Sequence, residues 1–236
     1  DDSPQQMDLT NVVDLFHEFG HVLEHILCDV NLGAFSGAHL VEEDATEAIA
    51  QFMEYWLFEG GMIEKLAEHN VNGNALPAEA LEHIQERREN AKATELLHRL
   101  FLGQLEVEVN AHFDPHGEES IVSIQRNHAE QFCPHHLPPK GNIDPLVQIF
   151  QSSAQGRSTM QYRYLFSDIM SADAFAAFLD ENGDLLQGDH IREIGMKFRK
   201  CYLEVGSSRS TAKGFEDFRG RKVESRALLS RYGLIQ

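Results

Sequence analysis

Apolar residues recur at intervals of three and four along most of this chain, which is the periodicity of amphipathic α-helices. The first such stretch runs from about residue 8 to Asp29, and Asp8 or Thr10 can cap its start. The apolar positions cover a wide arc of the helix surface, so we expect this helix to be deeply buried. Its apolar positions are Val12, Val13, Leu15, Phe16, Phe19, Val22, Leu23, Ile26 and Leu27.

Further helices are predicted wherever the same periodicity continues between breaks rich in glycine or proline. The prolines and the glycine within residues 133–145 indicate an irregular segment, and residues 147–159 fit neither pattern clearly. Alternating strand patterns are nearly absent, so the predicted fold class is mainly α. The predicted helices span residues 41–58, 62–69, 77–88, 91–113, 119–132, 160–179 and 190–204, with two short ones around Phe215 and over 225–232.

Two histidines stand four residues apart in the first predicted helix, within the stretch Phe16-His17-Glu18-Phe19-Gly20-His21. Residues four apart lie on one face of a helix, so both imidazoles can bind one metal ion. Glu18 follows the first histidine and can act as a base toward a metal-activated water. The alternative is a core helix whose histidines are satisfied by neighbouring carboxylates, since buried polar groups need partners.

The second predicted helix offers a third metal ligand. A catalytic zinc ion usually has three protein ligands and one open position. Apolar residues on the same helix predict that it is buried. Because buried carboxylates need a partner, we expect those of this helix to face a cation. The alternative is an acidic face that is exposed to solvent. The polar stripe of this helix consists of Asp44, Glu47, Gln51 and Glu54.

Composition narrows the class of protein. The 236 residues, 42% of them hydrophobic, suffice for one large domain or two small ones, and no apolar run approaches the roughly 20 residues that span a bilayer. The net charge of −18 argues against nucleic-acid binding and suits the steering of cationic peptides. Three cysteines suggest a reducing compartment without a disulfide framework. No targeting presequence is visible, and we expect Asp1 to be a processed or truncated end.

Several motifs follow one another in a fixed order along nearly the whole chain. The motifs are Leu15 to His21, Phe35-Ser36-Gly37, Asp44-Ala45-Thr46-Glu47, Ala50-Gln51, Glu54-Tyr55-Trp56, Arg199, Gly206-Ser207, Phe218-Arg219-Gly220-Arg221 and Ala227 to Leu234. Together they resemble the C-terminal, catalytic half of the thimet oligopeptidase (M3) family of zinc metallopeptidases, which includes oligopeptidase A and mitochondrial intermediate peptidase.

This resemblance implies that residues 1–236 form the catalytic, zinc-binding lobe of a two-lobed, α-helical metallopeptidase of the gluzincin type. It implies that His17, His21 and Glu47 bind one zinc ion per chain, that Glu18 is the general base, and that Asp44 orients a ligand histidine. The expected reaction is hydrolysis of short peptides, inside the cell, in mitochondria or the cytosol. Because the family's N-terminal half forms the opposite wall of the peptide channel, we expect a complementary N-terminal lobe or another protein chain as a partner.

The chain departs from the family pattern in residues 150–164. The family's histidine is missing there, Arg157 replaces the loop tyrosine, and Gln161 replaces the first paired tyrosine. Tyr162 and Tyr164 remain, and with Arg157 they are the candidates for holding the substrate and its oxyanion. Losing one oxyanion donor costs about 10²–10³ in rate. The alternative function is therefore a degenerate or split peptidase half that serves as a structural subunit.

Overall fold

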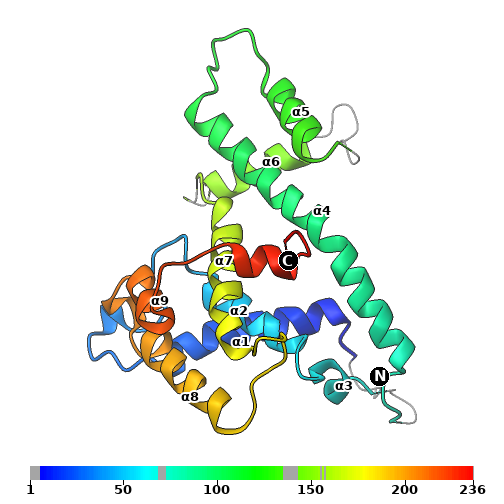
Figure 1. Cartoon of the computed structure of the whole chain (residues 1–236). Helices are drawn as coiled ribbons and strands as arrows, with labels where there is room; N and C mark the ends of the chain where they lie inside the picture. The colour runs from blue at the N-terminus through cyan, green and yellow to red at the C-terminus, as the bar shows by residue number, and fades with distance from the viewer. Residues whose placement is uncertain (1–5, 69–72, 135–142, 155, 157, 236) are drawn as a thin grey trace, which may run out of the picture. The chain divides into compact units, whose positions relative to one another are not determined.

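The computed structural model describes residues 6–68, 73–134, 143–154, 156 and 158–235 (Figure 1). Regular structure in this part of the chain is helical, with two isolated β-bridges, Glu68 with Ala75 and Leu179 with Leu185, and no strand. The predicted mainly α class is confirmed. The chain divides into two compact units: the first unit contains residues 1–87 and 167–236, and the second unit contains residues 88–166.

The first unit carries most of the short helices. The long helix α4 (Ala78–Ala111) begins in it, and α7 (Tyr162–Phe175) ends in it. Its other elements are α1 (Leu9–Ile26), η1 (Gly33–Phe35), α2 (Ala48–Leu57), α3 (Met62–Leu66), η2 (Ala176–Phe178), α8 (Gly188–Phe198), the π-helical turn η3 (Arg199–Leu203), η4 (Gly206–Ser208), α9 (Thr211–Arg219) and α10 (Arg226–Arg231).

Helix α1 begins where predicted, because the Asp8 carboxylate accepts a hydrogen bond of 2.9 Å from the backbone N–H of Asn11. The prediction that it is deeply buried is wrong. Gly20 and Glu24 are the buried residues of this fully described helix, and it packs mainly against α2. Its other apolar face stays open to solvent, and this exposed stripe consists of Leu15, Phe19, Val22 and Ile26.

Two other predicted boundaries differ from the structure. Helix α2 begins at Ala48 rather than at residue 41, since residues 43–47 form turns and Glu47 occupies the position before the first helical residue. The predicted helices 77–88 and 91–113 are one continuous helix, α4. Neither glycine nor proline occurs between Ala78 and Leu102, so nothing in the sequence breaks the helix near residue 90.

An aromatic cluster forms the core of the first unit and holds α2 in place. Phe52 of α2 stacks on Phe198 of α8 with ring centroids 4.2 Å apart, and it also contacts Phe175 and Phe178. Phe218 of α9 closes the cluster against Phe198 at 5.3 Å. Burying such rings supplies a large apolar area, so α2 is fixed by α7, η2 and α8 together.

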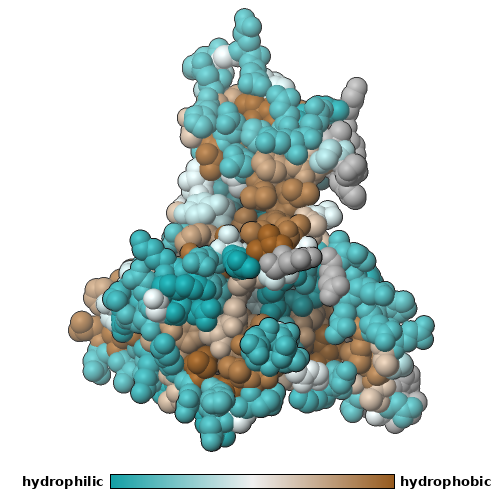
Figure 2. Space-filling view, in the orientation of Figure 1, coloured by the Kyte–Doolittle hydropathy of each residue, from teal (hydrophilic) through white to brown (hydrophobic). Residues whose placement is uncertain are grey.

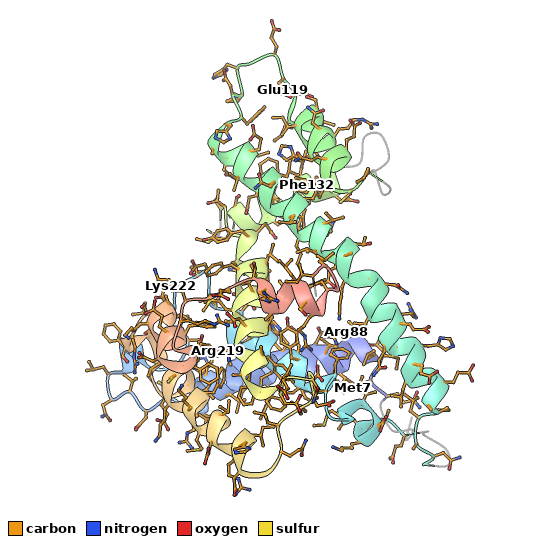
Figure 3. The ribbon with its side chains drawn as sticks, viewed as in Figure 1. Met7, Arg88, Glu119, Phe132, Arg219 and Lys222 are labelled. Atoms are coloured by element: carbon orange, nitrogen blue, oxygen red, sulfur yellow. The ribbon has the colours of Figure 1, made fainter. Side chains whose placement is uncertain are left out.

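The connection from α9 to α10 wraps around one buried carboxylate, that of Asp173 on α7. Arg221 binds it with two hydrogen bonds of 2.6 and 2.7 Å, and the backbone N–H of Glu224 donates a third at 2.9 Å. Gly220 ends α9 in the left-handed conformation that this turn requires. Figure 3 labels Arg219 and Lys222 on this connection. A buried carboxylate needs such partners, so the arginines near residue 220 have a structural role.

A second polar network ties α10 to α2. The Tyr55 hydroxyl donates to Asp168 Oδ1 at 2.5 Å, and the Tyr232 hydroxyl donates to Asp168 Oδ2 at 3.3 Å. Arg231 donates to Glu59 at 2.7 Å and places its guanidinium 4.4 Å from the centre of the Tyr55 ring. The last helix of the structure therefore braces the helix that follows Glu47.

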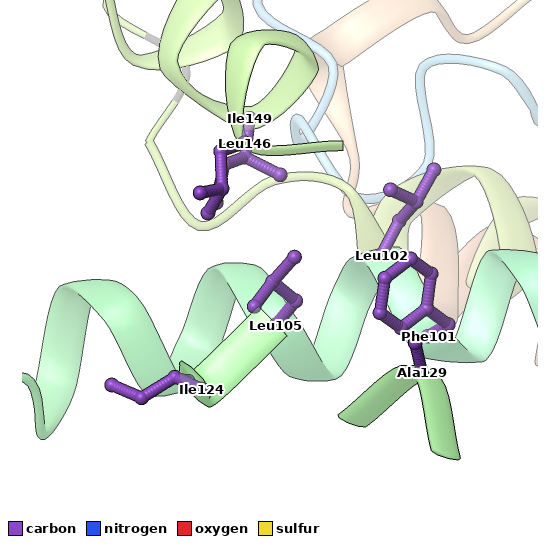
Figure 4. Packing of buried hydrophobic residues seen from close by; sticks show 7 residues of the cluster. All are labelled: Phe101, Leu102, Leu105, Ile124, Ala129, Leu146 and Ile149. Atoms are coloured by element: carbon purple, nitrogen blue, oxygen red, sulfur yellow. The ribbon is translucent and has the colours of Figure 1, made fainter. Parts of the chain in front are cut away.

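The second unit is built from the C-terminal part of α4, helices α5 (Ile121–Phe132) and α6 (Asp144–Ala154), and the start of α7. Helix α6 covers much of the stretch that fitted neither pattern, and Pro145 lies in its first turn, where proline is favoured. Leucines of α4 face α5 and α6 (Figure 4). The core residues are Phe101, Leu102, Leu105, Ile124, Ala129, Leu146 and Ile149.

Apolar residues also reach the surface among hydrophilic ones on the face shown in Figure 2. The first unit exposes Ile26 by 64% and Leu15 by 54%, and the second exposes Phe150 by 48%. None of the described helices is long and apolar enough to cross a membrane.

Candidate metal centre

His17, His21 and Glu47 come together between α1 and the start of α2. The two histidines lie on the same face of α1, with ring centroids 5.2 Å apart and ring planes at 84°. Glu47 Oε2 is 3.3 Å from His17 Nε2 and 3.6 Å from His21 Nε2. One donor atom from each residue lies within 4.8 Å of the other two, and all three side chains are partly buried.

This spacing fits a tetrahedral zinc ion. Zinc binds histidine nitrogen and carboxylate oxygen at about 2.0–2.2 Å, so ligand atoms of a tetrahedral site stand roughly 3.3–3.6 Å apart. Both distances from Glu47 to the imidazoles fall in this interval. The alternative of core histidines satisfied by carboxylates matches the structure in part. Both histidines contact carboxylates, but their side chains are 23% and 30% exposed rather than buried in a core.

Gly20 sets the approach of the two helices that form the centre. It is buried on α1 against the backbone of α2. A Cβ at this position would lie 2.6 Å from Ala50 Cα and 2.9 Å from the Ile49 carbonyl oxygen, which real Cβ atoms do not tolerate. The absence of a side chain at Gly20 therefore lets Glu47 approach His17 and His21.

Two further carboxylates contact the far sides of the imidazoles. Glu54 Oε1 lies 2.6 Å from His17 Nδ1, and Glu24 Oε2 lies 3.3 Å from His21 Nδ1. When each Nδ1–H donates to its carboxylate, the Nε2 lone pairs turn toward Glu47. This arrangement leaves each Nε2 facing Glu47, where it can bind a metal ion once its proton is lost.

The charges of the cluster depend on one another. Hydrogen bonds that His17 donates to Glu47 and then to Glu54 raise its pKa from 6.5 to about 9. Glu24 and then Glu47 raise the pKa of His21 to about 10. Contact with His17 and then His21 holds the pKa of Glu47 well below its usual range, whereas burial raises that of Glu24. Positive charge is therefore strongly favoured between these carboxylates, and a cation can supply it in place of protons.

Glu18 and Asp44 occupy different surroundings from the cluster. Glu18 follows His17 on α1 with an exposed side chain that water can reach. Asp44 accepts a hydrogen bond from Ser167 through its backbone oxygen, at 3.0 Å. Within the described residues its carboxylate contacts neither histidine, and Glu54 and Glu24 hold the positions expected for it. Glu54 belongs to the acidic stripe seen in the sequence; Glu24, three residues after His21, could have been found from helix geometry.

The candidate oxyanion residues belong to the second unit. Tyr162 and Tyr164 lie in the first turn of α7, exposed by 42% and 37%, while Arg157 lies outside the described residues. Arg163 donates a hydrogen bond of 2.9 Å to the Tyr164 hydroxyl and places its guanidinium 4.7 Å from the ring centre. Tyr164 and Gln161 line a cavity of about 440 Å³ in this unit.

Comparison with known proteins gives a consistent result over almost the whole chain. The model of peptidase family M3 matches residues 1–234. The chloroplastic/mitochondrial organellar oligopeptidase A of Arabidopsis thaliana is 30% identical over 99% of this chain and 29% of its own length. Oligopeptidase A of Escherichia coli is 31% identical over 94% of this chain and 32% of its own length. The chain thus spans about a third of the length of these relatives.

Proposed function

The chain belongs to peptidase family M3, and from this premise we propose that residues 1–236 are the catalytic part of a zinc-dependent peptidase that hydrolyses short peptides. We base the proposal on one observation, the three donor atoms of His17, His21 and Glu47 at zinc-ligand spacing. In this proposal the two imidazoles use Nε2 and Glu47 a carboxylate oxygen to hold one zinc ion. When bound, zinc polarises the scissile carbonyl and activates water for attack at neutral pH.

The protein's own residues supply the proton transfers. Glu18 is exposed beside His17, so it can take a proton from the attacking water and pass it to the leaving amine. Glu54 and Glu24 keep the imidazoles oriented while charge develops nearby. Tyr162 and Tyr164, together with Arg157, are the proposed donors to the oxyanion.

Two variants test the ligand set and the base separately. Glu47→Ala should lose most of the zinc measured by elemental analysis, where the unmodified chain holds about one ion. Glu18→Gln should keep its zinc and lose hydrolysis of a short quenched-fluorescent peptide, because it removes the base and no ligand. Unchanged zinc content in Glu47→Ala would refute the third ligand. Undiminished hydrolysis in Glu18→Gln would refute the base.

A structural subunit with little catalysis is the second candidate function, and Gln161 favours it. The family that the sequence resembles has a tyrosine at this position and another at that of Arg157. Loss of such donors should lower kcat more than it weakens peptide binding. We expect Arg157→Tyr with Gln161→Tyr to raise turnover when a complementary lobe or partner chain is supplied. Continued inactivity of that pair would support the structural subunit.

A further inference from the structure

Glu106 is a buried carboxylate in the second unit that peptide hydrolysis does not explain. It lies on α4 with 1% of its surface exposed. Its Oε2 accepts a hydrogen bond of 2.7 Å from the backbone N–H of Gln161, which directly precedes α7. Burial raises the pKa of Glu106, and the N–H groups of Gln161, Thr159 and Met160 oppose that shift. A carboxylate is costly to bury without donors, so the contact joins α4 firmly to this segment.

The segment that Glu106 holds has an unusual backbone. Thr159 has a φ of +59°, and among the described residues it is the one residue other than glycine with positive φ. A β-branched side chain disfavours this left-handed conformation. Such a conformation persists where surrounding contacts determine it, and the Glu106 carboxylate supplies them on one side of the turn.

The held segment leads directly into the residues proposed to contact the peptide. Gln161 is followed by Tyr162, Arg163 and Tyr164 in the first turn of α7. Arg163 is 4% exposed and donates to the Tyr164 hydroxyl, so the second phenol is oriented from within the unit as well. A change at Glu106 therefore alters the direction in which α7 begins, and this moves the side chains of Tyr162 and Tyr164.

We propose that Glu106 is a positioning residue that fixes residues 159–164 so that Tyr162 and Tyr164 are held ready for the peptide. This inference rests on the proposed function, which assigns the two phenols to the substrate. Glu106 itself is buried and touches no substrate. Because Glu106 orders the phenols in advance, no further conformational entropy is lost in ordering them during the reaction.

Three variants of the zinc-loaded protein test the proposal. Glu106→Leu removes every acceptor at similar volume, Glu106→Gln keeps one acceptor oxygen, and Glu108→Gln is the control. Glu108 lies on the same helix and bonds His112 at the surface, so its change removes a charge and not the anchor. The measurements are amide hydrogen exchange at residues 159–161, and kcat and KM for a short quenched-fluorescent peptide, expressed per bound zinc.

For Glu106→Leu we expect exchange at these amides to be about tenfold faster or more, and kcat to be about 10–100-fold lower with KM changed much less, because misplaced groups chiefly lower the rate. Glu106→Gln should have exchange rates and a kcat much closer to those of the unmodified protein, and Glu108→Gln should match the unmodified protein in both. If Glu106→Leu does not fold, Glu106→Asp, which withdraws the carboxylate by one methylene, should change both quantities in the same direction.

Unchanged exchange in the folded Glu106 variant would overturn the anchor. Faster exchange with unchanged kcat per zinc would overturn the positioning role and leave a purely structural contact. A zinc-loaded chain that cleaves no peptide even with a complementary lobe supplied would refute the proposed function instead. In that case hydrogen exchange still tests the anchor, and equal exchange at residues 159–161 in Glu106→Leu and the unmodified protein would overturn it.

Discussion

Gly20 on α1 is in backbone contact with Ala50 on α2, and this contact sets the distance from the histidines to Glu47. The glycine between the two histidines is therefore needed for packing between helices rather than for flexibility within one. A side chain there would separate the helices without touching any proposed ligand.

We accordingly expect Gly20→Ala to lower zinc affinity at least tenfold and to lower the melting temperature, because α1 and α2 must move apart. Competition with a chelator of known affinity measures the first effect and calorimetry the second. Gly195→Ala is the matched control, since Gly195 is also helical and a Cβ there meets nothing within 4 Å in the described structure. It should be neutral or stabilising by about 0.5–1 kcal/mol. Equal zinc affinity in Gly20→Ala and the unmodified protein would contradict the spacing role.

The carboxylates that contact the Nδ1 atoms of the two histidines lead to a separate prediction about zinc affinity. Glu54→Gln should lower zinc affinity by about 10–100-fold, because Glu54 orients His17 through a contact of 2.6 Å. Asp44→Asn, the carboxylate that the family resemblance favours for this task, should change affinity much less. Chelator competition on both variants measures the difference. A larger loss in Asp44→Asn than in Glu54→Gln would reverse the assignment.

The sequence pointed to His17, His21 and Glu47, and the structure brings these three residues together, while their role as metal ligands stays a prediction. The spacing of His17 and His21 follows from the helix period alone, so it could be read without a structure. The acidic stripe indicated Glu47, although periodicity could not show that this residue stands in the turn before α2. The contact of Glu24 with His21 was missed, although its place three residues later on the same helix was a signal for it.

Burial was the least predictable property of the fold. The apolar positions of α1 indicate a helix hidden on several sides, yet packing against α2 covers one side only. Periodicity reports which faces are apolar and not which neighbours cover them. In the same way, the absence of helix-breaking residues between Ala78 and Leu102 was a signal for one long helix, which the polar residues near Asn90 obscured.

The raised pKa values of the histidines predict a pH-dependent stability of the zinc-free protein. The pKa of His17 is about 9 and that of His21 about 10, against 6.5 when unperturbed. A raised pKa stabilises the fold fully below the unperturbed value and loses that effect as the pH rises through the folded value. The melting temperature of the zinc-free protein should therefore fall between about pH 7 and pH 10.

Two controls isolate this effect. The zinc-loaded protein should not show the same fall, because its ligand histidines carry no ligand-side proton at any of these pH values. A His17→Gln, His21→Gln double variant should have a flatter profile without zinc. A fall of the same size in the double variant would assign the pH dependence to other groups.

The exposed stripe of α1 predicts self-association. Its four residues follow one another at helical intervals and are 46–64% exposed. Contiguous apolar surface of this kind promotes association or requires a partner. We expect the isolated chain to form oligomers or aggregates in analytical ultracentrifugation, and Leu15→Gln with Ile26→Gln to shift it toward monomer. A monodisperse monomer with a cooperative melt in the unmodified chain would be the opposite result.

The contacts between α10 and α2 have a consequence for folding during synthesis. Glu59 and Arg231 are 172 residues apart, and Tyr55 and Asp168 are 113 apart. Contacts between such distant positions close large loops and form slowly. During synthesis the paired histidines and their acidic partner leave the ribosome long before the helix that steadies them. The nascent chain therefore passes through a period in which the ligands are present and their support has yet to be made.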